Sequence, residues 1–597
     1  MTQNKLKKSK SPIKVTKTFT ETKLKFAVNY YAGIVIAAVT FLIYMNTFML
    51  SYALDDSAAI TDNKFVQQGI SGIPKLMTTD FWYFSGPSLG YYRPLSLITF
   101  AIEYQFFGLS PHIGHFNNVM LFALTTFLLF LLLSRLFSGY NFIFPFLITL
   151  LFALHPIHTE IIANIKGRDE MLSFLNTVLM LIFVIRYYDS KKRLFLWLGL
   201  LFFYLALLSK ESAMAGIILV PLFLYYSGDL KIKDLLKKTF PYLFVIAFFL
   251  IQKAILYESV NVVIQSDNVN YPYHDEMVRS SSAFMMFLVF LKMLIVPYPL
   301  MHDYSYNQLP AVHWDNIWAL LGLAGFLTIL IIGLSGLRKK TITGFTICLF
   351  FILISPAFGF ILMRGGTFAE RLLFSPSLPY CIILTFALIK LTRTDLTKKI
   401  SITFSSIRSL LFITPIFLVI FILYSLDTIS RNPAWKDSFT LFATDLNKGP
   451  DCSLIQYHYG CEMMNNYIKE KDKVKRNEYL NEGLVSIKKA IKIFPHFSDA
   501  YYSLGNSYEF QAYDHQSHAY LDSAVNSYNM VIEMDSKGYK AYLRLGYIYQ
   551  MMGNNEAASY NFNATYMLNP DCTEAKTQAE QIKKTTGLDV RVKPGTR

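Results

Sequence analysis

The chain has 597 residues, of which 53% are hydrophobic and 16% aromatic, and it carries a formal net charge of +15. Its apolar residues form blocks of about 15 to 25, a length that spans a bilayer. In a soluble protein this charge would suggest nucleic-acid binding. Here Lys and Arg gather between the apolar blocks and in the N-terminal tail, as in cytoplasmic loops of membrane proteins. The composition predicts a multi-pass membrane protein and no nucleic-acid partner.

The N-terminal residues 1–26 form a basic tail, and an apolar run of about 27–50 follows it. This run is too long for the apolar region of a signal peptide, and no small-x-small cleavage site follows it. We expect an uncleaved first span with its N-terminus in the cytoplasm. The lysines of the tail are Lys5, Lys7, Lys8, Lys10, Lys14, Lys17, Lys23 and Lys25.

Four basic clusters further along the chain predict which loops face the cytoplasm. They are Lys191–Arg193, Lys231–Lys238, Arg338–Lys340 and Arg393–Lys399. Threading spans between them predicts eleven crossings and an external C-terminus. The predicted spans are 27–50, 113–137, 141–157, 170–189, 193–208, 212–228, 240–257, 314–336, 341–362, 373–391 and 407–427. Two further apolar stretches, 94–108 and 282–300, break this parity, so we expect re-entrant or interfacial helices there.

A pair of carboxylates, Asp55 and Asp56, follows the first span and opens an external loop of about residues 51–112. Uncompensated charge is costly near hydrocarbon, so the pair is a candidate functional site; the alternative is a solvated acidic loop. The predicted topology puts several other polar segments on the same side. A transporter would place its charges near the midplane, whereas a cluster at one face indicates an active site at the membrane boundary. These segments are His155–Glu170, Lys210-Glu211, His302–Tyr306 and Arg364–Arg371.

Beyond Leu426 the chain becomes polar and repetitive. Small residues at fixed positions allow two helices to cross closely, aromatic residues fill the space around them, and Pro ends the second helix. This spacing predicts about three tetratricopeptide repeats and a capping helix near 571–586, within residues 428–586, followed by a tail at 587–597. The marker residues are Tyr542, Leu545, Gly546, Tyr549, Ala558, Phe562 and Pro570, then Tyr501, Leu504, Gly505 and Tyr508, then Tyr457, Gly460, Ala490 and Pro495.

The five cysteines give weaker signals. Cys348 and Cys381 fall in apolar spans, where cysteine packs as a small hydrophobic residue. A bridge between Cys452 and Cys461 stays open for an oxidising compartment, but the polar region has an odd count of cysteines, which includes Cys572. No spacing typical of metal ligands accompanies them.

Short motifs along the membrane part resemble the transmembrane-and-tetratricopeptide-repeat O-mannosyltransferase family. They are Tyr92–Leu95, Leu154–Glu160, Gly167–Glu170, Ser209–Glu211, Asp303–Ser305, Glu370–Leu372 and Pro376-Ser377. The resemblance covers nearly the whole chain, including the order of membrane part and repeats. It implies an all-α fold, with a polytopic GT-C-like membrane bundle (residues 27–427) followed by an α-solenoid of repeats. Eukaryotic members carry longer arrays, so the departure here suggests a bacterial relative and leaves the protein clients open.

The resemblance also implies a polyprenyl-phosphate sugar donor, an acidic pair at the position of Asp55 and Asp56, and inversion at the sugar carbon. A lipid-anchored donor needs no nucleotide-binding fold, and the chain shows no such glycine-rich motif. Asp55 is the predicted general base and Asp56 its orienting neighbour. The predicted donor-phosphate ligands are Arg168, Lys210, Arg371, His155 and His158. The predicted acceptor-binding or orienting residues are Arg93, Glu160, Glu170, Glu211, His302, Asp303 and Glu370.

Each assignment has an alternative. Arg168 and Lys210 could be interfacial side chains paired with neighbouring glutamates, and Arg371 could pair with Glu370. His155 and His158, with Glu160, could be read as a metal site, but Pro156 makes the local geometry uncertain; phosphate binding or a structural role is preferred. His302 and Asp303 could cap a helix. We predict no metal ligands, and a dependence on a divalent metal stays open.

The predicted function is transfer of a sugar, with mannose implied by the resemblance alone, from polyprenyl phosphate to Ser or Thr of exported proteins bound by the repeats. Alternatives are transfer to a glycan or lipid, a non-catalytic scaffold, or a flippase for lipid-linked sugars. The acidic pair with external basic residues favours an enzyme over a scaffold. The predicted location is the bacterial inner membrane with site and repeats facing the periplasm, or the ER lumen in a eukaryote.

Overall fold

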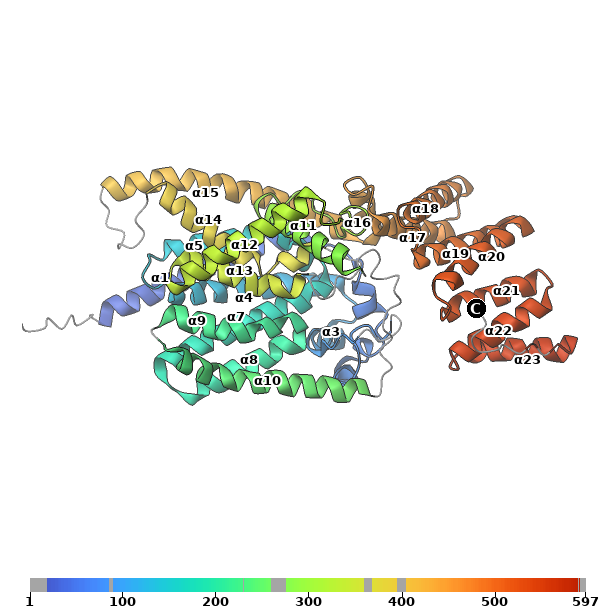
Figure 1. The fold of residues 1–597 in the computed structure, drawn as a ribbon, viewed down its shortest axis with the longest axis horizontal. Coiled ribbons are helices and arrows are strands. Elements are labelled where there is room, and N and C mark those ends of the chain that lie inside the picture. Colours follow the sequence, from blue (N-terminus) through green and yellow to red (C-terminus); the bar gives the residue numbers. More distant parts are fainter. Residues whose placement is uncertain are drawn as a thin grey trace, which may run out of the picture.

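The computed structural model describes residues 19–84, 90–228, 230–258, 275–358, 368–393, 404–588 and 590. Within these residues every regular element is a helix and no strand is present. The helices α1 to α15 form a bundle, and α16 to α23 extend from one end of it (Figure 1). The predicted all-α class, a membrane bundle followed by repeat-like helices, is confirmed.

Seven helical stretches are long and apolar enough to cross a bilayer, and a bent pair around His155 makes an eighth if it counts as one span. The helices that carry the seven are α1 (Phe19–Tyr44), α4 (Pro111–Leu136), α7 (Arg168–Ser190), α10 (Ile232–Glu258), α11 (Glu276–Ile295), α12 (Ile317–Arg338) and α15 (Phe404–Arg431). The chain is therefore a multi-pass membrane protein by helix length and composition.

Five of the eleven predicted spans are shorter helices. At about 1.5 Å per residue, a helix of 12 residues rises only about 18 Å, less than the hydrocarbon core. This is why eleven crossings do not follow from length alone. The five shorter helices are α5 (Ile143–Leu154), α8 (Arg193–Ser209), α9 (Gly216–Ser227), α13 (Ile342–Ile354) and α14 (Ser377–Leu391). The 3-10 turns η6 (Glu211–Ala215) and η8 (Ser355–Ala357) lengthen α9 and α13.

The polar residues divide between the two ends of the bundle. Arg135, near the end of α4, pairs with Asp189 at the end of α7 (2.7 Å), and Lys340 after α12 donates to the carbonyl of Gly228 after α9 (2.6 Å). These contacts gather the basic clusters at one end. Helix α7 begins at the other end, with Arg168, and its 23 residues rise about 34 Å. Residues 51–112, which are predicted to be the first external loop, and the repeats lie at that other end (Figure 1).

The two apolar stretches that break the predicted parity form helices α3 and α11. Helix α3 (Pro94–Phe107) packs against the η3 turn (Val66–Gly72), against α8 and beside α2 (Ile73–Leu76). Helix α11 begins where Ser281 donates to the carbonyl of Val312, just before α12, and it ends where the carbonyl of Leu294 bonds His155. The start of α11 therefore contacts the segment before α12, and its end contacts the segment that follows α5.

The C-terminal helices are three antiparallel pairs and a final helix, at the positions of the predicted repeats. An ideal Cβ on Gly546 would lie 2.6 Å from the ring of Phe562, and one on Gly505 would lie 2.8 Å from that of Tyr528, so glycine permits each crossing. The pairs are α17 (Ser453–Lys469) with α18 (Lys473–Ile493), α19 (Ser498–His515) with α20 (His518–Met534), and α21 (Tyr539–Met551) with α22 (Asn555–Leu568); α23 (Thr573–Thr586) follows.

A short connection joins bundle and repeats through η10 (Asn432–Lys436) and α16 (Ser438–Leu446). The bridge between Cys452 and Cys461, which the sequence left open, does not form. Both thiols are free, and nine residues along α17 separate them by about 13 Å. Several predictions fall outside the described residues. They concern the lysines at 5–17, Arg364, Lys398 and Lys399, and most of the tail at 587–597.

The close approach of α11 to α12 gives a test of the bundle. An ideal Cβ on Gly322 would lie 2.0 Å from the backbone oxygen of Phe284, whereas one on Gly325, in the same helix, would meet nothing within 4 Å. Gly322→Ala should therefore force the two helices apart and cost about 1–3 kcal/mol. Melting of the detergent-purified protein should fall for Gly322→Ala and not for the control Gly325→Ala. Equal melting of the two variants would contradict this packing.

Candidate functional site

The side chain of Asp56 is fully buried and joins two segments that are far apart in the sequence. One carboxylate oxygen accepts the backbone N–H of Ala53 (3.0 Å), and the other accepts that of Lys166 (2.7 Å). Burial raises the pKa of Asp56 to about 7, although the two backbone hydrogen bonds oppose the shift. Asp56 thus fixes the first external loop to the turn that precedes α7.

Asp55 differs from its neighbour because 35% of its side chain is exposed. Its carboxylate lies 3.6 Å from the ammonium of Lys166, whose own side chain is only 8% exposed. Lys166 belongs to the η5 turn (Ile165–Gly167), and an ideal Cβ on Gly167 would lie 2.3 Å from the carbonyl oxygen of Ile161, so this turn requires glycine. Lys166 is not among the residues predicted for the site, although its place two residues before Arg168, in the same polar segment, was the available signal.

An ion-pair network continues inward from Lys166. Its ammonium lies 3.7 Å from the carboxylate of Asp169, which pairs with Arg93 at 2.9 Å. Arg93 in turn pairs with Glu211 at 2.9 Å. Charges of opposite sign therefore alternate through side chains that are at least four-fifths buried. Lys210 pairs with Glu170 beside this network.

A second ion pair faces Asp55 from the start of the η9 turn (Glu370–Leu373). The carboxylate of Glu160, on α6 (Thr159–Ala163), accepts the backbone N–H of Arg371 at 2.8 Å and a guanidinium N–H at 2.5 Å. The charge of Glu160, followed by those of Asp55 and Asp303, raises the pKa of Arg371. Arg371 keeps 38% of its side chain exposed. The predicted alternative pairing of Arg371 with Glu370 is not the one observed.

Glu370 is fully buried and bonds a different segment from Arg371. One of its oxygens accepts the backbone N–H of Met301 (2.5 Å) and the hydroxyl of Tyr304 (2.7 Å). Burial raises the pKa of Glu370 to about 8. Its environment suits a structural role at the loop of residues 299–304.

His302 and Asp303 lie at the junction with the repeats. The backbone and ring of His302 contact the carboxylate of Asp445 (2.7 and 3.0 Å), which also pairs with Arg431 at 2.5 Å. Burial alone would raise the pKa of Asp445, but the hydrogen bond from His302 and the charge of Arg431 hold it well below its usual value. Asp303 accepts the thiol of Cys452 at 3.3 Å.

No protein-family model matches the chain, but several curated proteins are similar to it. It is 26% identical over 440 residues to protein O-mannosyl-transferase F38B6.6 of Caenorhabditis elegans, covering 72% of this chain and 59% of that protein. It is 26% identical over 489 residues to mouse protein O-mannosyl-transferase TMTC4, covering 72% and 64%, and 24% identical over 532 residues to human TMTC1, covering 79% and 56%.

The chain resembles these protein O-mannosyl-transferases, and it spans between half and two thirds of their length. The resemblance expected from the sequence motifs is thereby confirmed, and the motif residues can be located in the structure.

Three predicted donor ligands of the chain lie in closed surroundings. Arg168 donates to Asn118 (2.7 Å), Thr99 and the carbonyl of Gly114, and it pairs with Glu103. All its guanidinium nitrogens are thus engaged, which favours a structural role. His155 bonds the carbonyl of Leu294 (3.0 Å) and His158 the hydroxyl of Ser377 (2.9 Å); both are fully buried.

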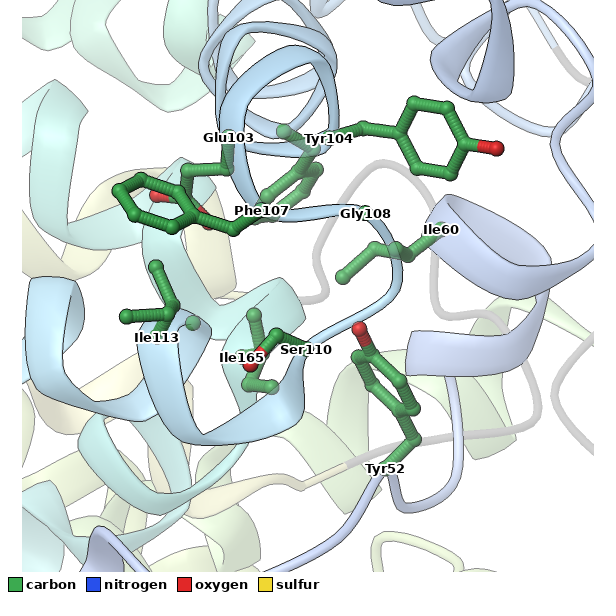
Figure 2. A pocket seen from close by; sticks show the side chains of 11 residues that line it. Tyr52, Ile60, Glu103, Tyr104, Phe107, Gly108, Ser110, Ile113 and Ile165 are labelled. Atoms are coloured by element: carbon green, nitrogen blue, oxygen red, sulfur yellow. The ribbon is translucent and has the colours of Figure 1, made fainter.

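A small pocket lies between residues 52–60 and helices α3 and α4 (Figure 2). Tyr52 and Ile60 line one side, and Glu103 and Phe107 line the other. Its free space of about 10 Å³ holds roughly one water molecule, so it does not hold a sugar in this state. Within the described ranges, no group of three or more His, Cys, Asp and Glu side chains is placed to hold a metal ion.

The buried carboxylate of Asp56 predicts a pH-dependent stability. Because its pKa is about 7 in the fold against an ordinary 3.8, the folded chain keeps a proton that the unfolded chain loses. Stability therefore falls as pH rises from about 4 to 7, by at most about 1.4 kcal/mol per unit. Asp56→Asn removes this titration, so the melting temperature of the variant minus that of the wild type should increase from pH 5 to 7.5. A difference that stays constant would argue against the buried carboxylate.

Proposed function

We propose that this chain is a membrane glycosyltransferase that moves mannose from a polyprenyl phosphate to a Ser or Thr hydroxyl of exported proteins. The similarity to proteins named protein O-mannosyl-transferase, over about 72% of the chain, supports this reaction class. The observation that carries the proposal is Asp55, a carboxylate with 35% of its side chain exposed among charged groups that are mostly buried. Such a group can meet an acceptor at the membrane boundary.

In the proposed reaction the acceptor hydroxyl attacks the anomeric carbon while Asp55 takes the hydroxyl proton. The bond between that carbon and the phosphate oxygen breaks, and the polyprenyl phosphate leaves with the electron pair. A single displacement of this kind inverts the anomeric carbon. General-base assistance typically contributes about 10²–10⁴-fold to the rate. Asp56 holds the loop that presents Asp55 and takes no proton in the reaction.

Lys210 and Arg371 are the proposed ligands of the leaving phosphate. Arg371 is 38% exposed beside Asp55, and its guanidinium keeps further donors beyond the one bonded to Glu160. Lys210 lies near Asp169 and pairs with Glu170 at the edge of the ion-pair network. Arg168, His155 and His158 are left out of this proposal because their polar atoms contact other parts of the bundle.

The repeats are the proposed binding surface for the protein acceptor. They begin at the end of the bundle that carries Asp55, since Asp445 and Cys452 contact the loop of His302 and Asp303. The basic clusters gather at the opposite end, which supports a cytoplasmic position for that end. The proposed orientation therefore puts the site and the repeats in the periplasm, or in the ER lumen of a eukaryotic cell.

Asp55→Asn should abolish transfer while the chain still folds. Purified protein is incubated with polyprenyl-phosphate sugars and a peptide mixture, and products are read by mass spectrometry. We expect a loss of about a hundredfold or more, because the general base is gone. The matched control is Asp62→Asn, an exposed aspartate in the same loop, which should keep wild-type turnover. Near-normal activity of Asp55→Asn would overturn the mechanism; wild-type protein that transfers no sugar to any peptide would favour a scaffold.

Arg371→Ala and Lys210→Ala should impair use of the donor more than use of the acceptor. Losing one charge-assisted contact costs about 1.5–3 kcal/mol, which corresponds to a rise of roughly 10- to 150-fold in the KM for the donor. Arg135→Ala is the control, because Arg135 forms an exposed ion pair at the other end of the bundle. Unchanged donor KM values in both variants would show that Arg371 and Lys210 form structural ion pairs and do not bind the donor phosphate.

A further inference from the structure

Lys166 is a buried cation in the candidate site that the proposed reaction does not yet use. Its ammonium lies 3.6 Å from an oxygen of Asp55 and 3.7 Å from one of Asp169, while 92% of its side chain is buried, given its 8% exposed fraction. Removing a charge from water is costly unless another charge compensates for it. The ammonium is therefore held where it is by these two carboxylates.

The surroundings of Lys166 leave it little freedom. Its backbone N–H is bonded to Asp56 at 2.7 Å, and its ammonium lies over the rings of Phe81 (5.8 Å) and Trp82 (5.4 Å). Ring faces attract cations. Lys166 is thus positioned by the same carboxylate pair whose exposed member it contacts.

The two carboxylates next to Lys166 differ in their other partners. Asp169 pairs with Arg93 at 2.9 Å and its side chain is only 2% exposed. Asp55 is 35% exposed, and the ammonium of Lys166 is its ion-pair partner among the described residues. Lys166 therefore links the exposed carboxylate to the rigid network within the protein.

We propose that Lys166 is a positioning residue that holds the carboxylate of Asp55 in the orientation that receives the acceptor proton. This inference rests on the proposed function, because it gives Asp55 the role of base. The attacking and leaving oxygens lie on opposite sides of the reacting carbon in a single displacement. A cation that contacts the base therefore acts on the acceptor side of the reaction.

The test compares Lys166→Met with Lys166→Arg in the full-length protein, using the peptide-transfer assay. If Lys166 acts through Asp55, Lys166→Met should lower kcat about tenfold or more and leave the KM values for donor and peptide within about threefold. Lys166→Arg keeps the positive charge and should recover most of kcat. Melting temperature is measured alongside, and Lys166→Gln replaces Lys166→Met if that variant does not fold.

A second experiment tests whether Lys166 acts through Asp55. In the Asp55→Asn background, followed over long incubations, Lys166→Met should cause no further loss of rate. The inference is overturned if Lys166→Met keeps wild-type kcat, if it raises the donor KM instead, or if its effect is as large without Asp55. The proposed function fails separately, when wild-type protein shows no transfer or when Asp55→Asn is fully active.

Discussion

The candidate site depends on one buried carboxylate. Asp56 accepts N–H groups from Ala53 and from Lys166, which are 113 residues apart in the numbering, and nothing in the local sequence of either segment would bring them together. A buried carboxylate is costly unless it is hydrogen-bonded, so the loop and the turn before α7 stabilise each other only when both are in place. This contact sets Asp55 and Lys166 side by side, so the geometry of the candidate site follows from a structural contact.

Charge compensation explains which groups remain available for chemistry. Lys166, Asp169, Arg93 and Glu211 alternate in sign, so each buried charge has a neighbour of opposite sign. Buried pairs of this kind stabilise little by themselves, but removal of one partner leaves a costly isolated charge. The network therefore holds its own charges in place. Asp55, which pairs with Lys166, and Arg371, which pairs with Glu160, keep more exposed side chains, and the proposed function assigns these two residues to substrate contact.

The sequence predicted the elements better than their partners. Apolar blocks located helices such as α4 and α12 to within a few residues, and the glycine and aromatic spacing located the helix pairs of the repeats. Helix lengths were harder, because a short helix extended by a 3-10 turn has the same composition as a full span. Ion pairs were harder still: Arg371 pairs with Glu160, 211 residues away, rather than with its neighbour Glu370. Such choices are made by tertiary packing, which no local pattern encodes.

At the junction with the repeats, as at the candidate site, a buried carboxylate joins segments that are far apart in the sequence. Asp445 on α16 pairs with Arg431 at the end of α15 and with His302 in the loop before α12, and it is fully buried. Because the pKa of Asp445 is held below its usual value, its charge persists through the neutral range, and stability from this contact is lost only as pH falls through the acid range. The first repeat also contacts Asp303, whose charge reaches Arg371. The repeats are therefore anchored to the loop that borders Arg371, so that a protein bound along the array, as proposed, would be held near Asp55 rather than at an arbitrary distance from it.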